Sequence, residues 1–257
     1  MNPFLTIATR AAQNAGKVIV RGLNKLESLD VKTKGRNDYV SEIDLMAESV
    51  ILRTIQDAYP EHGILAEESG KSGDSEYQWI IDPLDGTTNY LHGFPVFAVS
   101  IALMHKNELK VAVIYDPMRD EMFTAANGEG AFLNQHRIRV SGQRNMKFAL
   151  IGTGFPFRNY DNLDVYLAMF RSILPKVSGI RRPGAAALDL AYLAAGRLDG
   201  FWEIGLSVWD IAAGVLIIKE AGGVVSDFAN QDNFLESGNI VAGSAEIHQE
   251  LLNHMKI

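Results

Sequence analysis

The chain has 257 residues, of which 47% are hydrophobic and 21% charged, an ordinary balance for one large globular domain or two modest ones. Its net charge of −7 argues against nucleic-acid binding through overall charge, and the absence of cysteine excludes disulfides, thiolate metal sites and cysteine nucleophiles. The N-terminal segment predicts an amphipathic helix instead of a signal peptide, and no apolar run is long enough for a membrane span. We therefore expect a cytoplasmic protein.

The first part of the chain is predicted to hold two helices and a short strand. We expect helices over 3–21 and 42–58, a strand at 64–66, and polar loops over 32–36 and 70–76. Ser41 caps the second helix, Asp44 suits its acidic first turn, and Pro60 ends it. Glu67 and Glu68 follow the strand, and because neighbouring strand residues point to opposite faces, we assign only Glu67 to a site there.

A short apolar run at 79–81 is followed by two aspartates in a turn. Pro83 has no N–H and is expected to end the strand, which leaves Asp82 and Asp85 close enough to share one cation or two neighbouring ones. Gly86 allows the backbone to approach a ligand closely. The pattern is typical of a magnesium-dependent phosphate enzyme, whereas considered alone it also fits an ordinary acidic turn.

The rest of the chain predicts an antiparallel meander and then alternating strands and helices. Meander strands are expected at 97–105, 108–115, 122–126 and 137–140. Further strands are expected at 148–153, 179–182, 198–204, 224–225 and 239–242, with helices at 161–174, 184–195, 208–221 and 245–256. The change from a meander to alternating strands and helices predicts an N-terminal half over 1–145 and a C-terminal half over 146–257, joined in one catalytic unit.

Carboxylates recur where strands end or helices begin. Glu203 closes a predicted strand, and Asp210 opens a helix, where a carboxylate is also often a simple cap. With Glu67, Asp82 and Asp85 they occupy the positions at which α/β folds place ligand sites. Because the candidate ligands are all hard oxygens, the set favours magnesium or manganese over zinc.

These segments resemble the inositol monophosphatase family, and the resemblance runs from the first predicted helix to the last. It is carried by EES at 67–69, DPLDGTTN at 82–89 and WDIAAG at 209–214, with support from RRPGAAAL at 181–188 and EAGG at 220–223. The resemblance implies an α+β fold, a layered αβαβα sandwich that forms homodimers. It also implies a phosphatase that is inhibited by lithium and uses two or three Mg²⁺ ions per subunit.

The family's functional residues match positions of this chain one by one. The metal ligands match Glu67, Asp82, the Leu84 carbonyl, Asp85 and Asp210. The pair that activates water matches Glu67 and Thr87, with Thr87 paired to Asp44. Substrate contacts match Asp85, Gly86, Thr87, Arg181, Gly184, Ala185, Ala186, Glu203 and Asp210. Two departures stand out: Lys34 matches the family's lysine only across a one-position gap, and Ala185 stands where some relatives carry a hydroxyl residue.

The resemblance implies hydrolysis of myo-inositol 1-phosphate or a related polyol or sugar monophosphate. The alternatives are a related specificity, for fructose 1,6-bisphosphate, histidinol phosphate or a 3′-phosphonucleotide, and a regulatory role. Close bacterial relatives are implicated in transcription antitermination and ribosomal RNA maturation through contact with RNA polymerase, which makes the transcription machinery a candidate partner. The sequence predicts no membrane association and no direct nucleic-acid site.

Overall fold

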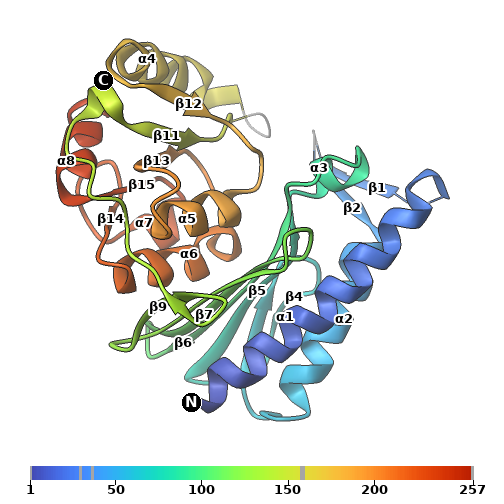
Figure 1. Cartoon of the computed structure of the whole chain (residues 1–257). Helices are drawn as coiled ribbons and strands as arrows, with labels where there is room; N and C mark the ends of the chain where they lie inside the picture. The colour runs from blue at the N-terminus through green and yellow to red at the C-terminus, as the bar shows by residue number, and fades with distance from the viewer. Residues whose placement is uncertain (1, 29–30, 36–37, 157–159, 256–257) are drawn as a thin grey trace.

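The computed structural model describes residues 2–28, 31–35, 38–156 and 160–255, which form a layered α+β sandwich (Figure 1). The first part of the chain contains α1 (Pro3–Gly22), η1 (Leu23–Ser28), β1 (Val31–Gly35), β2 (Asp38–Ser41), α2 (Glu42–Gln56), β3 (Gly63–Ala66), β4 (Gly70–Ser72), β5 (Tyr77–Asp85), α3 (Thr87–Leu91), β6 (Ala98–His105), β7 (Glu108–Asp116), β8 (Glu121–Ala126), β9 (Gly130–Leu133) and β10 (His136–Arg137). The second part contains η2 (Met146–Phe148), β11 (Leu150–Thr153), η3 (Tyr160–Asn162), α4 (Leu163–Ile173), η4 (Leu174–Lys176), β12 (Gly179–Arg181), α5 (Ala186–Ala194), β13 (Gly200–Glu203), α6 (Val208–Glu220), β14 (Val224–Ser226), α7 (Phe234–Ser237), β15 (Ile240–Gly243) and α8 (Ala245–Asn253). Across these ranges, no helix combines the length and apolar character needed to traverse a bilayer.

Two large sheets organise the molecule. The 8-stranded sheet has the order β10-β9-β8-β7-β6-β5-β3-β4, and within it β3 and β5 run parallel. The 5-stranded sheet has the order β12-β11-β13-β15-β14, in which β11 is parallel to β12 and β13. The parallel pair β3–β5 matters for the site, because it brings the carboxyl ends of both strands to the same edge.

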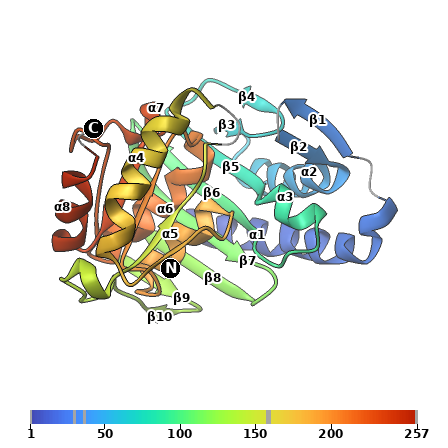
Figure 2. The same ribbon diagram turned by 90° about the horizontal axis from the view of Figure 1, so that it is seen from above.

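Helices fill the space outside and between the sheets, giving five layers. Helices α1 and α2 cover one face of the larger sheet, and α5 and α6 lie between its other face and the smaller sheet (Figure 1). Helices α4 and α8 pack on the outer face of the smaller sheet. Figure 2 shows the α1–α2 pair and α8 at opposite ends of this stack.

Two helices illustrate how the sequence specifies these layers. Helix α1 buries one face, which includes Ala8, Ala12, Ala15 and Ile19, because its apolar residues recur at helical spacing. Helix α6 is buried from Asp210 to Ile218, as expected for a helix enclosed by two sheets.

The structure corrects several predicted elements. Strand β5 does not stop at Pro83 but continues to Asp85, because a register shift against β6 accommodates the proline's missing N–H. The predicted loops at 32–36 and 70–76 contain strands, since β1 pairs with β2 and β4 pairs with β3 through the backbone. An edge strand was expected at 137–140, but strand β10 there covers only His136 and Arg137. It pairs with β9, a strand that was not predicted.

The ends of several helices also differ from the predictions. Helix α2 ends at Gln56, α5 begins at Ala186, and α8 ends at Asn253. The predicted strand at 148–153 begins only at Leu150, after the short helix η2. Helix ends carry unsatisfied backbone groups, so their position depends on local capping more than on hydrophobic spacing.

Candidate functional site

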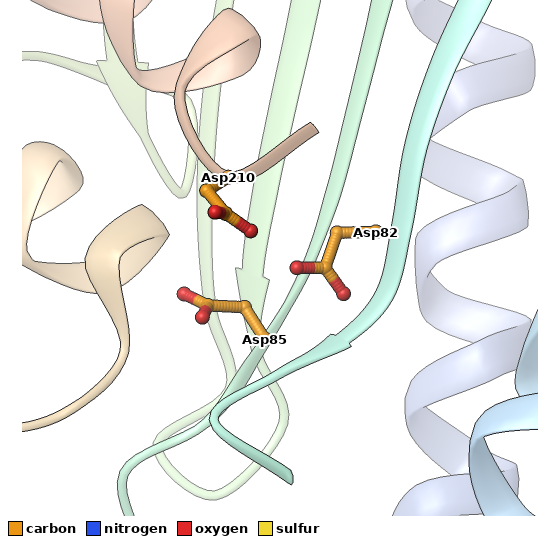
Figure 3. A group of neighbouring side chains, drawn as sticks. All are labelled: Asp82, Asp85 and Asp210. Carbon is orange, nitrogen blue, oxygen red and sulfur yellow. The ribbon is translucent and has the colours of Figure 1, made fainter. Parts of the chain in front are cut away.

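Three aspartates from two distant parts of the chain meet at the edge of the larger sheet. Asp82 and Asp85 lie at the end of β5, and Asp210 lies in the first turn of α6, with the three side chains turned toward one another (Figure 3). One carboxylate oxygen from each lies within 4.8 Å of the others. The structure therefore brings together three of the predicted metal ligands, one of which, Asp210, lies more than a hundred residues after the other two in the sequence.

Hydrogen bonds to the backbone hold each aspartate in place. The Leu84 N–H donates to Oδ1 of Asp82 at 2.9 Å, and the Ala187 N–H donates to Oδ2 of Asp85 at 2.7 Å. The Ser207 N–H donates to Oδ2 of Asp210 at 2.7 Å as part of a capping box. Capping therefore does occur at Asp210, but the carboxylate also faces the other two aspartates.

The electrostatics of this cluster favour a bound cation. Burial raises the pKa of Asp82 well above its usual value, and the negative charges of Glu67, Asp85 and Asp210 raise it further. Glu67 lies in the turn after β3, where its N–H donates to the Ile81 carbonyl at 3.1 Å. Four acidic groups in one place, with oxygen as the donor atom throughout, fit a hard divalent cation such as magnesium.

A cavity of about 600 Å³ contains these carboxylates. The predicted site residues that line it are Glu67, Asp82, Leu84, Asp85, Gly86, Thr87, Gly184, Ala185, Ala186, Glu203 and Asp210. Glu68 is not among the lining residues, and its N–H donates to Oε2 of the buried Glu48 at 2.9 Å. Glu67 therefore lines the cavity and Glu68 does not, although the two residues lie in a turn. The alternation of side chains along a strand, which was expected to separate them, does not apply there.

Thr87 connects the cavity to a carboxylate behind it. Its Oγ1 donates toward Oδ1 of Asp44 at 2.9 Å and lies 3.0 Å from the Leu84 carbonyl oxygen. Asp44 is buried in the capping box of α2, where its Oδ2 accepts from the N–H and the hydroxyl of Ser41. Burial raises the pKa of Asp44 even though these hydrogen bonds act in the opposite direction.

Gly86 is required by the backbone at the cavity edge. Its φ of 91° lies in the left-handed region, and a Cβ there would come within 2.9 Å of the Val96 carbonyl oxygen. Asn89, three residues on, donates to the carbonyls of Val96 and Pro183 at 2.8 and 2.9 Å. This amide ties α3 to the segment that leads into α5, a contact that no local sequence pattern predicts.

The structure places Arg182 in the cavity where the sequence predicted Arg181. Arg181 is exposed at the end of β12, and its guanidinium donates to the Ile180 carbonyl at 3.1 Å. Arg182 lines the cavity, with its guanidinium carbon 5.4 Å from the centre of the Phe155 ring. Successive residues leaving a strand point in opposite directions, so a shift of one position changes which arginine faces the site.

Three further residues, Asp189, Asp44 and Lys34, lie outside the acidic cluster. Asp189 also lines the cavity and was not predicted, because within a helix of small residues it has no motif that distinguishes it from an ordinary polar position. Asp44 does not line the cavity but is hydrogen-bonded to Thr87, which does. Lys34 lies in β1, and its side chain is outside the described part of the structure.

Comparisons with known proteins found matches over nearly the whole chain. A model of the inositol monophosphatase family matches residues 1–256. Nus factor SuhB of Pseudomonas aeruginosa is 54% identical over 98% of this chain and 95% of its own length. The crystal structure of extragenic suppressor protein suhB from Bartonella henselae has a TM-score of 0.97 and 46% identity, covering 99% of each chain. Inositol monophosphatase from Anabaena has a TM-score of 0.87 and 42% identity, covering 98% of this chain and 94% of its own.

Proposed function

The chain belongs to the inositol monophosphatase family, and from this premise we propose that it is a magnesium-dependent phosphatase of polyol or sugar monophosphates. The observation that carries the proposal is the meeting of Asp82, Asp85 and Asp210 within 4.8 Å in a cavity that also contains Glu67 and Thr87. Clustered carboxylates that raise one another's pKa are costly unless a cation or a proton offsets their charge.

Five groups would hold magnesium: the carboxylates of Glu67, Asp82, Asp85 and Asp210, and the Leu84 carbonyl. The family resemblance suggests two or three ions in each subunit. When bound, magnesium polarises the phosphoryl group and lowers the pKa of a water molecule.

The remaining chemistry falls to the chain's own side chains. The Thr87 hydroxyl donates its single proton to Asp44, which leaves its lone pairs available to accept a hydrogen bond from the attacking water. Glu67 lines the same cavity and acts as the acceptor for that water's proton. Glu203 and Asp210 accept hydrogen bonds from hydroxyls of the alcohol part of the substrate.

The test is a phosphate-release assay with magnesium or with EDTA over a substrate panel. The panel contains inositol 1-phosphate, other polyol and sugar monophosphates, fructose 1,6-bisphosphate, histidinol phosphate and a 3′-phosphonucleotide. Magnesium-dependent release that is greatest for one monophosphate and is lost in Asp85→Asn supports the proposal. If the folded protein releases phosphate from none of these esters, the proposal is wrong.

A second function is suggested by relatives that bear the name Nus factor. We propose that the chain also contacts the transcription machinery, and that a homodimer is its working form. A reconstituted transcription assay with wild type and Asp85→Asn separates the two roles. An effect on transcription that survives Asp85→Asn assigns the regulatory role to the surface and not to hydrolysis, whereas no effect of either protein removes that role. Light scattering measures the oligomeric state directly.

A further inference from the structure

Asp189 is a buried carboxyl group in the cavity wall that no predicted function uses. It lies in the first turns of α5, its side chain is 1% exposed, and it lines the cavity. Within the described residues, its Oδ1 accepts no hydrogen bond. An unpaired buried carboxyl oxygen is unfavourable for stability, so an ordinary structural role does not account for this side chain.

Helix capping is the simplest structural explanation, and the contacts do not support it. Acidic residues in the first turn of a helix interact favourably with the helix dipole. The N-cap position of α5 is Ala185, and no side-chain cap hydrogen bond is formed there. In this first turn, the Ala187 N–H donates to Oδ2 of Asp85 at 2.7 Å, so that donor is satisfied without Asp189.

The surroundings of Asp189 are polar and mixed in charge. Burial raises the pKa of its carboxyl well above the usual value, the negative charges of Glu203 and Asp85 raise it further, and the positive charge of Arg182 acts in the opposite direction. Glu203 lies directly against Gly154, where a Cβ atom would overlap its carboxylate. Arg182 lies over the ring of Phe155, which is itself 47% exposed and lines the cavity.

This wall differs in chemistry from the aspartate cluster at the edge of the larger sheet. It offers carboxyl oxygens, a guanidinium and an aromatic ring, all from residues after position 150. Hydroxyl groups and the C–H face of a polyol match such a wall, because hydroxyls both donate and accept while a ring packs against apolar C–H groups. The phosphate, by contrast, needs the cation-binding side of the cavity.

We propose that Asp189 is a specificity-determining residue whose carboxyl group pairs with a hydroxyl of the alcohol part of the substrate, beside Glu203 and Arg182. The inference rests on the proposed phosphatase function, because it assumes a phosphorylated substrate in this cavity. It adds one residue to that function: through Asp189 the enzyme discriminates esters of polyhydroxylated alcohols from those of plain alcohols.

Two substrates with the same six-membered ring test this selection. Inositol 1-phosphate carries hydroxyls around the ring and cyclohexyl phosphate carries none, so their ratio of kcat/KM measures recognition of hydroxyls. In Asp189→Ala, which leaves no hydrogen-bonding group at this position, the ratio should fall about tenfold, roughly the value of one net hydrogen bond. The fall should come from a higher KM for the inositol ester, with hydrolysis of cyclohexyl phosphate unchanged. Asp189→Val, which also removes the carboxyl group, should give the same change and serves if the first variant misfolds.

Asp116→Ala is a matched control for replacing a buried carboxylate. Asp116 is fully buried, but its oxygens accept from the Met118 N–H and from the Arg119 guanidinium, each at 2.9 Å. We expect this control to lower the melting temperature and to keep the wild-type substrate ratio. Asp189→Ala should show the reverse: a melting temperature equal to or above that of wild type, with a reduced ratio.

The outcomes separate this inference from the proposed function. If wild type releases phosphate from neither ester, the phosphatase assignment fails and this inference fails with it. If wild type is active but both Asp189 variants keep its ratio, or lose activity equally on both esters, only the role of Asp189 is overturned.

Discussion

The hydroxyl of Thr87 lies 2.9 Å from Oδ1 of Asp44, so a side chain at the cavity edge is hydrogen-bonded to a carboxylate buried at the start of α2. The same carboxylate accepts from the N–H and the hydroxyl of Ser41 through its other oxygen. A single side chain therefore caps a helix and orients the hydroxyl that faces the proposed attacking water. A change at Asp44 is therefore expected to affect both the start of α2 and the reaction.

Asp44→Asn should reduce kcat while leaving the protein folded. The backbone N–H of Ser41 cannot reverse its direction, so the new amide turns its carbonyl toward Ser41 and its NH₂ toward Thr87. The Thr87 hydroxyl then accepts from that NH₂ in place of donating, so its proton points elsewhere and one lone pair is no longer available to the attacking water. We expect a loss of about 100-fold in kcat, at the lower end of the range for acid–base groups, measured by phosphate release with magnesium.

Ser41→Ala is the control for the capping role of the same network. It removes the cap that accepts the Ile43 N–H but leaves Thr87 and Asp44 in place. Its melting temperature should fall, by the equivalent of about 1 kcal/mol, with kcat largely retained. Equal losses of kcat in Ser41→Ala and Asp44→Asn would assign the effect to the helix start alone.

Glu67→Gln should lower turnover by at least about 100-fold, because it preserves the shape of the side chain but removes a general base. Glu68→Gln is its neighbour-matched control, since Glu68 does not line the cavity. We expect the control to retain most of the wild-type activity in the same assay. Near-normal turnover of a folded Glu67→Gln protein would remove Glu67 from the proposed reaction.

Magnesium should raise the melting temperature of wild type and raise it much less in Asp85→Asn and Asp210→Asn. A ligand that binds only the folded state stabilises it by about 2.7 kcal/mol at a hundredfold excess over its dissociation constant. In EDTA, both variants should be at least as stable as wild type, because each removes one of several mutually repelling charges. Thermal melts of the three proteins under both conditions measure this, and equal magnesium shifts in all three would contradict the assignment.

Lithium at millimolar concentration should inhibit magnesium-driven phosphate release. Lithium is small and binds hard oxygens, so it competes for the carboxylates of the cluster without supplying a double charge. Titration of lithium at fixed magnesium, with sodium at equal ionic strength as the control, measures the effect. Indistinguishable curves for the two salts would mean that the cluster does not bind lithium in the working enzyme.

The free energy of unfolding should decrease as pH falls below about 6.5, in part because of His248. Burial lowers the pKa of His248 in the folded protein, so the unfolded chain binds a proton at a pH where the folded chain does not. The stability contributed by the neutral side chain is present above the unfolded pKa and is lost as pH falls through the folded pKa. One such group contributes a slope of at most about 1.4 kcal/mol per pH unit.

His248→Gln tests this contribution with a conservative side chain. The Ser226 hydroxyl donates to the Asp227 carbonyl at 2.8 Å, so the His248 Nε2, 2.8 Å from Ser226 Oγ, is the donor, and a glutamine amide offers the same donor. Denaturant melts between pH 7.5 and 5 should show a shallower decrease in the variant. His136→Gln, at an exposed histidine, should retain the wild-type slope. Parallel curves for wild type and His248→Gln would exclude the contribution.

The sequence by itself determined the chemical identity of the site. Short-range patterns specify it: a strand that runs into Asp82 and Asp85, a glycine after them, and Asp210 at a helix start. These patterns depend on the backbone preferences of neighbouring residues, so they can be recognised without a structure. The same local rules located the buried face of α1 and most of the strands.

Only the tertiary structure decided which side chains complete the cavity. Arg182 faces it and Arg181 does not, because the choice depends on how the last residues of β12 are oriented. Asp189 is buried because α5 is enclosed between two sheets, and no residue near it in sequence reveals that enclosure. The distance between Asp82 and Asp210 likewise depends on the packing of α6 against the larger sheet, which is a sum of many contacts between residues far apart in the chain.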